Sequence, residues 1–165
     1  MPTIGTPAPP FVLPGVQAGR VRRFSLADYA GRWVALFFYP ADFSFVCPTE
    51  VKGFQALYPA FAAAGAEVLG VSVDPPDLHL RWVEELGGID YPLLSDEARE
   101  VSRRYGVLDE PSGRAQRATF ILRPGGTVEY LLVSPTNVGR SIEETLRVLR
   151  ALQSGQQCPA GWQPE

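Results

Sequence analysis

The chain has 165 residues, of which 45% are hydrophobic and 20% are charged, and its formal net charge is −3. This length and composition suit a single globular domain over residues 1–165 and disfavour binding to nucleic acid or to an anionic membrane surface. Two cysteines and one histidine are too few for the usual four-ligand zinc site, so no structural metal is expected.

No targeting or membrane signal is visible in the sequence. The N-terminus lacks the basic stretch and apolar core that are typical of a secretory signal. The longest apolar run, Trp33–Tyr39, is far too short to span a bilayer. We therefore expect a cytoplasmic protein, because thiols are normally kept reduced in that compartment.

The first predicted elements are a hairpin, a buried strand and a helix. Phe11–Leu13 and Arg20–Ser25 are expected to pair as a short hairpin after a proline-rich lead-in. Trp33–Tyr39 has the β-branched and aromatic density of a buried strand. Hydrophobic residues at helical spacing then predict a helix from about Pro48 to Ala64.

The middle of the chain predicts one strand and two helices. Glu67–Asp74 has the pattern of a strand, and Pro76–Leu86 that of an amphipathic helix. A further helix is predicted over Ser95–Tyr105, with Ala98 among its inward residues.

The last predicted elements are a hairpin and a helix. Ala118–Leu122 and Thr127–Val133 flank an Arg-Pro-Gly-Gly turn. Ser141 stands at capping-box spacing from Glu144 and predicts the start of the helix, and residues 153–165 form an aperiodic tail. The whole order predicts an α/β fold with a central mixed sheet flanked by helices, which is compatible with a thioredoxin-like fold.

Cys47 stands where the buried strand has ended and a helix begins. Pro48 suits the first turn of a helix, and the free N–H groups and dipole of that turn favour a thiolate over a thiol. Hydroxyl groups of Ser44 and Thr49 are near enough in sequence to donate hydrogen bonds to it or to a bound oxygen. A buried, inert cysteine is the common alternative, and this position alone does not exclude it.

The residues around Cys47 resemble the active-site loop of peroxiredoxins, in particular the typical two-cysteine type of the alkyl hydroperoxide reductase C-component and thiol-specific antioxidant family. The family motif of Pro, three residues, Thr or Ser, two residues and Cys falls on Pro40, Ser44 and Cys47. Arg117 matches the family's arginine at the start of a later strand. Further segments resemble the family in order along nearly the whole chain: Val71–Asp74, Tyr91–Asp96, Asn137–Ser141 and Cys158–Trp162.

This resemblance implies a thioredoxin-like fold with the peroxiredoxin N-terminal extension, and a peroxidase that uses no metal or organic cofactor. Cys47 would attack hydrogen peroxide or an organic hydroperoxide and become a sulfenic acid. Arg117 and the Ser44 hydroxyl would stabilise charge on the peroxide oxygens, and Pro40 would shield the site.

The resemblance also implies roles for residues farther along the chain. Glu50 and Arg140 would orient Arg117. Cys158, in the tail over residues 153–165, would be the resolving cysteine and form a disulfide with Cys47 of the partner in a homodimer that can close into a ring of dimers. A thioredoxin-like protein or a flavoprotein disulfide reductase would donate the electrons. Sequence separation by itself leaves an intrachain disulfide open.

Three departures from the family pattern affect these expectations. Ser44 replaces the commoner threonine, which predicts a working but looser site. Only Gly87-Gly88 remains of the longer glycine-rich loop, and the sequence ends soon after Trp162, without the family's C-terminal Tyr-Phe helix. Because those two features slow resolution in the family, we expect resistance to over-oxidation.

Three other functions compete with the peroxidase. A thioredoxin-fold chaperone-like or binding protein with secondary peroxidase activity remains an alternative. A thiol–disulfide oxidoreductase is disfavoured, because Cys158 is not three positions from Cys47. A histidine-activated cysteine is also disfavoured, since His79 lies at helical spacing from Trp82 and is interpreted as structural.

Overall fold

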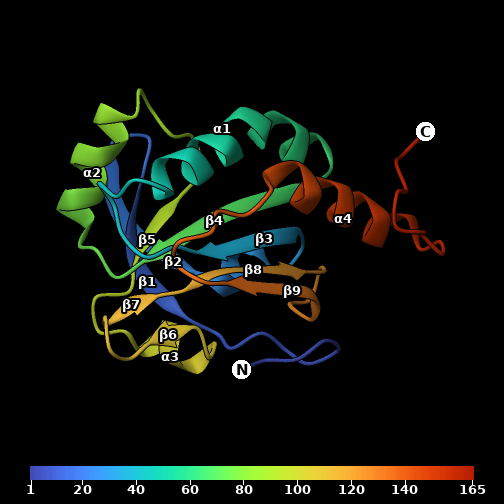
Figure 1. The fold of residues 1–165 in the computed structure, drawn as a ribbon, viewed down its shortest axis with the longest axis horizontal. Helices are drawn as coiled ribbons and strands as arrows, with labels where there is room; N and C mark the ends of the chain where they lie inside the picture. The colour runs from blue at the N-terminus through green and yellow to red at the C-terminus, as the bar shows by residue number, and fades with distance from the viewer.

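A seven-stranded mixed sheet forms the centre of the protein in the computed structural model, which describes residues 1–165 (Figure 1). Its strand order is β2-β1-β5-β4-β3-β8-β9. The strands are β1 (Val12–Gln17), β2 (Arg20–Ser25), β3 (Trp33–Phe38), β4 (Ala66–Ser72), β5 (Leu93–Ser95), β8 (Arg117–Leu122) and β9 (Val128–Ser134). Strands β3, β4 and β5 are parallel, whereas β8 pairs antiparallel with β3, and β9 pairs antiparallel with β8. The predicted α/β fold with a mixed sheet is confirmed.

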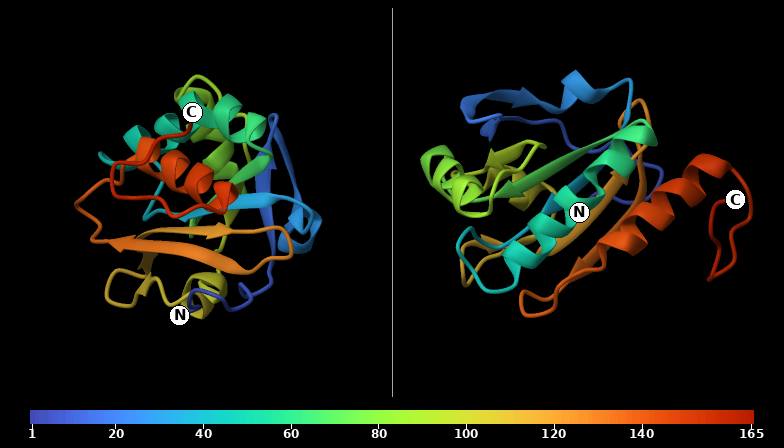
Figure 2. Two further views of the ribbon diagram at one scale, coloured as in Figure 1. Left: turned by 90° about the vertical axis from the view of Figure 1, so that its right-hand side faces the viewer. Right: turned by 90° about the horizontal axis from the view of Figure 1, so that it is seen from above.

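The helices divide between the two faces of this sheet (Figures 1 and 2). One face carries α1 (Cys47–Ala63), α2 (Pro76–Glu85) and α4 (Ile142–Ser154). The other carries the short helix α3 (Glu100–Arg104), the N-terminal segment and the small hairpin of β6 (Leu108–Asp109) and β7 (Arg114–Ala115). A 3₁₀ turn, η1 (Leu26–Tyr29), leads from β2 toward β3. None of the helices has the length and apolarity needed to cross a bilayer.

Strand β3 separates two hydrophobic cores, which explains its continuous apolar sequence. Alternate side chains enter the core on the α3 face (Val34, Leu36, Phe38) and the core on the α1 face (Ala35, Phe37, Tyr39). On the α1 face, the ring of Phe37 stacks on Phe54 with centroids 4.2 Å apart. The carboxyl end of β3, where the chain leaves toward Cys47, is therefore held rigidly on both sides.

The predicted N-terminal hairpin is confirmed, and its first strand is longer than predicted. β1 continues to Gln17 and pairs with β5 as well as with β2. This second pairing requires glycine at position 15, because a Cβ there would lie 2.6 Å from the Leu93 carbonyl oxygen. Ala18 and Gly19 have positive φ (52° and 73°), as a tight hairpin turn requires.

The helix predicted over Ser95–Tyr105 is wrong in its first half. Ser95 ends strand β5, which pairs with β4, and α3 begins only at Glu100. The Asp96 carboxylate accepts hydrogen bonds from the main-chain N–H groups at positions 101 and 102, at 3.2 and 2.7 Å, and so fixes the start of α3. Ala98, predicted to face inward, is exposed in the connecting turn.

Candidate active site

Cys47 is the first residue of α1 and is completely buried, at 0% exposure. The chain enters α1 through the loop that follows β3, and Pro48 occupies the first helical turn, where its missing N–H costs no hydrogen bond. No side chain caps this end of the helix. The sequence therefore predicted the position of the thiol correctly.

Arg117 lies directly beside the thiol. It opens β8, which pairs antiparallel with β3, so its guanidinium meets the carboxyl end of β3 and the start of α1. Its Nη1 donates to Cys47 Sγ at 3.2 Å, and its Nε donates to the Thr136 carbonyl oxygen at 2.8 Å. Burial opposes the charge of the guanidinium, but the hydrogen bond to Cys47 and the charges of Cys47 and Glu50 outweigh it and raise the pKa of Arg117.

A single carboxylate, that of Glu50, joins two arginines beneath the thiol. Arg117 Nη1 donates to Glu50 Oε1 at 2.5 Å, and Arg140 Nε donates to Glu50 Oε2 at 2.6 Å. Burial raises the pKa of Glu50, but its hydrogen bonds to Arg140 and the charges of Arg140 and Arg117 outweigh that effect, so the pKa is lowered. Arg140 also donates to the carbonyl oxygens of Phe38 and Ala118, at 2.6 and 2.7 Å, which ties together the strands on either side.

The buried charged cluster beside Cys47 carries a net positive charge. The Arg117 and Glu50 side chains are 3% and 1% exposed, and that of Arg140 is fully buried. Two guanidinium groups and one carboxylate leave one positive charge without a partner, and an unpaired buried charge is costly. A thiolate on Cys47 supplies the missing negative charge, and the thiolate is the nucleophilic form of cysteine.

The hydroxyl groups near Cys47 are turned to main-chain oxygens. Ser44 Oγ donates to the Ala41 carbonyl oxygen at 3.0 Å, and Thr49 Oγ1 to the Val46 carbonyl oxygen at 2.6 Å. Neither hydroxyl donates to the sulfur, so the expected hydrogen bond to the thiol is not formed. Ser44 remains in the loop beside the site, whereas Thr49 is exposed, and Pro40 is buried at the end of β3.

His79 has a structural position and does not contact the thiol. Its Nδ1 lies 2.6 Å from Asp42 Oδ2 and its Nε2 lies 3.1 Å from the Leu94 carbonyl oxygen. Tyr39 donates to the other oxygen of Asp42 at 2.7 Å, so this buried network fixes the start of the active-site loop. A histidine-activated cysteine is therefore contradicted. No three His, Cys, Asp or Glu side chains gather closely enough to hold a metal ion.

Cys158 lies at the opposite end of α1 from Cys47. Helix α4 extends to Ser154, so the predicted tail begins slightly later, at Gly155. Cys158 Sγ lies 3.7 Å from the Ala151 carbonyl oxygen and 3.5 Å from Ser154 Oγ, both in the last turn of α4. The two thiols of one chain are thus not brought together.

Comparisons with known proteins agree with this geometry. Residues 4–131 match the sequence model of the AhpC/TSA family. The chain belongs to this family. It is 45% identical to the putative peroxiredoxin YkuU of Bacillus subtilis (strain 168), over 98% of this chain and 94% of that protein. It is 44% identical to peroxiredoxin-2 of Cricetulus griseus, over 98% of this chain and 86% of the relative.

Solved structures extend the peroxiredoxin relationship to the fold. The crystal structure of Enterococcus faecalis AhpC superposes with a TM-score of 0.91 at 39% identity, covering 96% of this chain and all of that one. The reduced 2-Cys peroxiredoxin of Plasmodium vivax gives a TM-score of 0.91 at 36% identity, over 98% and 90% of the two chains. The protein is a peroxiredoxin, a thiol-dependent peroxidase with the thioredoxin-like fold of these enzymes.

Two parts of the site were missed from the sequence. The Thr136 carbonyl, which orients Arg117, is a main-chain group and leaves no side-chain signal. The Asp42–His79–Tyr39 network does not follow from helical spacing, which places His79 on a helix but does not identify its partner. The sequence signal that could have predicted this network is the presence of a single histidine, His79, and an acidic residue, Asp42, in the active-site loop.

Proposed function

We propose that this peroxiredoxin reduces hydrogen peroxide and organic hydroperoxides through a sulfenic acid on Cys47, which Cys158 of a second subunit resolves as a disulfide. The observation that carries the first step is the Arg117 guanidinium 3.2 Å from the sulfur, within a buried cluster that lacks one negative charge. A fixed cation at this distance stabilises the attacking thiolate.

In the first step, the Cys47 thiolate attacks the terminal peroxide oxygen and the O–O bond breaks. The other oxygen leaves with the bonding electrons, takes a proton and departs as water or an alcohol. Arg117 stabilises the charge that develops on these oxygens, and the Ser44 hydroxyl joins it by turning away from the Ala41 carbonyl oxygen. Glu50 and Arg140 keep the guanidinium in place, and Pro40 shields the sulfur from solvent.

The position of Cys158 favours a disulfide between subunits. Helix α1 has 17 residues and therefore rises by roughly 25 Å from Cys47 toward Ala64. Gln153 Nε2 donates to the Ala64 carbonyl oxygen at 2.6 Å, so the end of α4 lies at the far end of α1. A disulfide needs Cα atoms within about 7 Å. The four-residue step from Ser154 to Cys158 reaches at most about 14 Å, so an intrachain bond would require part of α4 to unravel.

Strand β9 offers a surface for the second subunit. It is the last strand of the sheet, and N-terminal residues cover only its start, through hydrogen bonds of Gly5 and Thr6 with Val128. Beyond Val128, its outer edge has no main-chain partner, and Leu132 is 38% exposed. An open apolar edge is a template for another strand. We place the homodimer contact here, as an antiparallel pairing of two β9 strands about a two-fold axis.

The disulfide must be reduced before the next turnover. A thioredoxin-like protein or a flavoprotein disulfide reductase would restore both thiols by thiol–disulfide exchange. A reducing compartment such as the cytoplasm suits this cycle.

Peroxide consumption with a thiol reductant tests the proposal in wild type, Cys47→Ser and Cys158→Ser, together with a non-reducing gel. We expect no activity without Cys47, and a peroxide-induced band at twice the subunit mass that is lost in either variant. An active Cys47→Ser protein would overturn the first step. An oxidised monomer that migrates faster than the reduced one would show an intrachain bond and overturn the second.

A further inference from the structure

The tail beyond Cys158 is held to the rest of the chain by one hydrogen bond. Arg147 Nη1 donates to the Trp162 carbonyl oxygen at 3.2 Å, and residues 159–165 make no other hydrogen bond outside the tail. Within the tail, the Trp162 N–H donates to the Pro159 carbonyl oxygen at 2.9 Å and closes a turn. The bond from Arg147 therefore fixes the turn that begins at Cys158.

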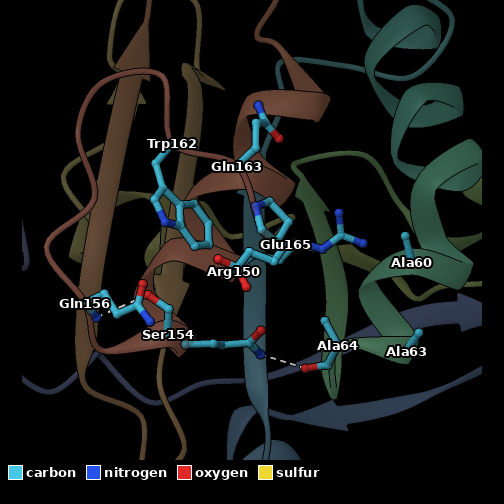
Figure 3. A pocket seen from close by; sticks show the side chains of 11 residues that line it. Ala60, Ala63, Ala64, Arg150, Ser154, Gln156, Trp162, Gln163 and Glu165 are labelled. Atoms are coloured by element: carbon cyan, nitrogen blue, oxygen red, sulfur yellow. Dashed lines mark hydrogen bonds between the residues drawn. The ribbon is translucent and has the colours of Figure 1, made fainter.

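Side-chain packing under the tail is loose. A cavity of about 750 Å³ lies between the tail and the ends of α1 and α4 (Figure 3). Trp162, Gln163 and Glu165 line it from the tail, and Ala60 and Ala63 line it from α1. Because the tail covers a cavity rather than a packed core, few apolar contacts hold it in place besides the hydrogen bond from Arg147.

Arg147 is itself oriented by a neighbour on α4. Its Nε and Nη2 donate to the two oxygens of Glu144, at 2.6 and 2.7 Å. The predicted capping box is thus only half formed: the Glu144 N–H donates to Ser141 Oγ at 3.2 Å, but its carboxylate turns to Arg147. The Arg147 side chain is 18% exposed, and its Nη1, which does not contact Glu144, donates to the Trp162 carbonyl oxygen.

Arg147 also lies close to the second thiol. Arg147 and Cys158 line one surface cavity of about 340 Å³ beside α4. The hydrogen bond to Glu144 is the main cause that raises the pKa of Arg147, and Cys158 contributes to the same rise. The thiol itself faces α4, against the Ala151 carbonyl oxygen and Ser154 Oγ. It must leave this position to reach Cys47 of another subunit.

We propose that Arg147 is a positioning residue that clamps the Cys158–Trp162 turn on α4, and thereby sets the rate at which Cys158 resolves the Cys47 sulfenic acid. This inference rests on the proposed function. In the step, the Cys158 sulfur bonds to the Cys47 sulfur, the S–O bond breaks and the oxygen leaves as water after taking the thiol proton. If disulfide formation is slow, a second peroxide oxidises the Cys47 sulfenic acid to a sulfinic acid. The clamp therefore also sets the peroxide dose that inactivates the enzyme.

Arg147→Met tests the clamp, with Arg150→Met as its matched control. Arg150 lies on the same helix and lines the cavity under the tail, but it makes no hydrogen bond to the tail. Stopped-flow fluorescence after mixing with hydrogen peroxide follows Cys47 oxidation and disulfide formation as separate phases. We expect Arg147→Met to leave the first phase within about twofold and to accelerate the second about five- to tenfold, the effect of one charge-assisted hydrogen bond.

The peroxide dose for half-inactivation should rise with the rate of disulfide formation, and Arg150→Met should match wild type in both. Should Arg147→Met not fold, Glu144→Gln, which removes the orienting carboxylate, should show a smaller acceleration in the same direction. Disulfide formation that is unchanged or slower in these variants would overturn the clamp. This conclusion holds even if the variants also have a lower melting temperature than wild type. A wild-type protein that forms no Cys47–Cys158 disulfide would instead overturn the proposed function.

Discussion

The buried carboxylate of Glu50 should be the most sensitive point of the site, and Glu50→Gln tests this. In the wild type the carboxylate accepts from Arg117 once and from Arg140 through the main-chain N–H, Nε and Nη2, at distances of 2.5 to 3.1 Å. Glutamine keeps the shape but removes the charge and turns an NH₂ group toward a guanidinium. Removing one partner of a buried ion pair costs about 3–5 kcal/mol, so we expect the free energy of unfolding at pH 7 to fall by about that amount.

The loss of stability caused by Glu50→Gln should become smaller as the pH falls. The pKa of Glu50 is lowered in the folded protein from the usual value of 4.5. The ion pairs of Glu50 therefore contribute their full stability above about pH 4.5, and this contribution is lost as the pH falls through the lowered value of the folded state. The difference between wild type and Glu50→Gln should accordingly narrow below pH 4.5.

Urea unfolding of the reduced proteins at one fixed protein concentration measures this difference at pH 7 and in acid. Glu85→Gln is the matched control, because Glu85 is exposed on α2 and makes no ion pair. We expect the control to follow wild type at each pH. A Glu50→Gln protein as stable as wild type at pH 7, or a difference that stays constant into acid, would refute the reasoning from the buried charges.

Three further substitutions test other parts of the structure. Arg117→Lys should slow Cys47 oxidation about 100-fold in stopped-flow measurements, because one ammonium cannot reach the sulfur, Glu50 and the Thr136 carbonyl together; a loss under threefold would contradict its role. Ser44→Ala should slow the same step about tenfold, while Ser44→Thr keeps the hydroxyl and stays near wild type. Gly15→Ala should destabilise the fold by about 1–3 kcal/mol, since its Cβ meets the Leu93 carbonyl at 2.6 Å, whereas Gly31→Ala, with open space around it, should not.

The helices and strands that could be predicted from sequence are those whose local hydrophobic pattern reflects which of their faces are buried. Strand β3 is buried on both faces and reads as an apolar run, and α1 and α4 show helical spacing. Strand β5 could not be predicted, because its three residues gain their conformation from pairing with β4. The sequence from Ser95 onward is compatible both with a helix and with a turn that precedes a shorter helix. Hydrogen bonds from the main chain to the Asp96 carboxylate stabilise the turn.

The active site also has features that could be predicted from sequence and features that depend on the tertiary structure. Cys47, Arg117 and their order along the chain follow from a motif, because each needs a particular side chain at a particular element end. The direction of the Ser44 hydroxyl does not follow, since it depends on a loop in which Phe43 has a φ of 54°. Such a left-handed conformation is unfavourable for a bulky residue and is imposed by the surrounding structure.

The charges around Cys47 make the packing of the site depend on the oxidation state of the sulfur. With a thiolate, the buried cluster holds two positive and two negative groups. A disulfide sulfur is neutral, so Arg117, Arg140 and Glu50 are left with one positive charge that lacks a partner, which weakens the packed state. A sulfinic acid is again an anion, and it should restore the packing of the reduced form.

Amide hydrogen exchange over residues 44–54 therefore distinguishes the three oxidation states. We expect strong protection in the reduced and sulfinic forms and weaker protection in the disulfide form, with strand β4 (66–72) as an internal reference whose exchange stays the same. The exposed ring of Phe45, at 95%, shows that the loop before α1 adds little packing to resist this opening. Equal protection in all three forms would show that the charge on the sulfur does not hold the first turn of α1 in place.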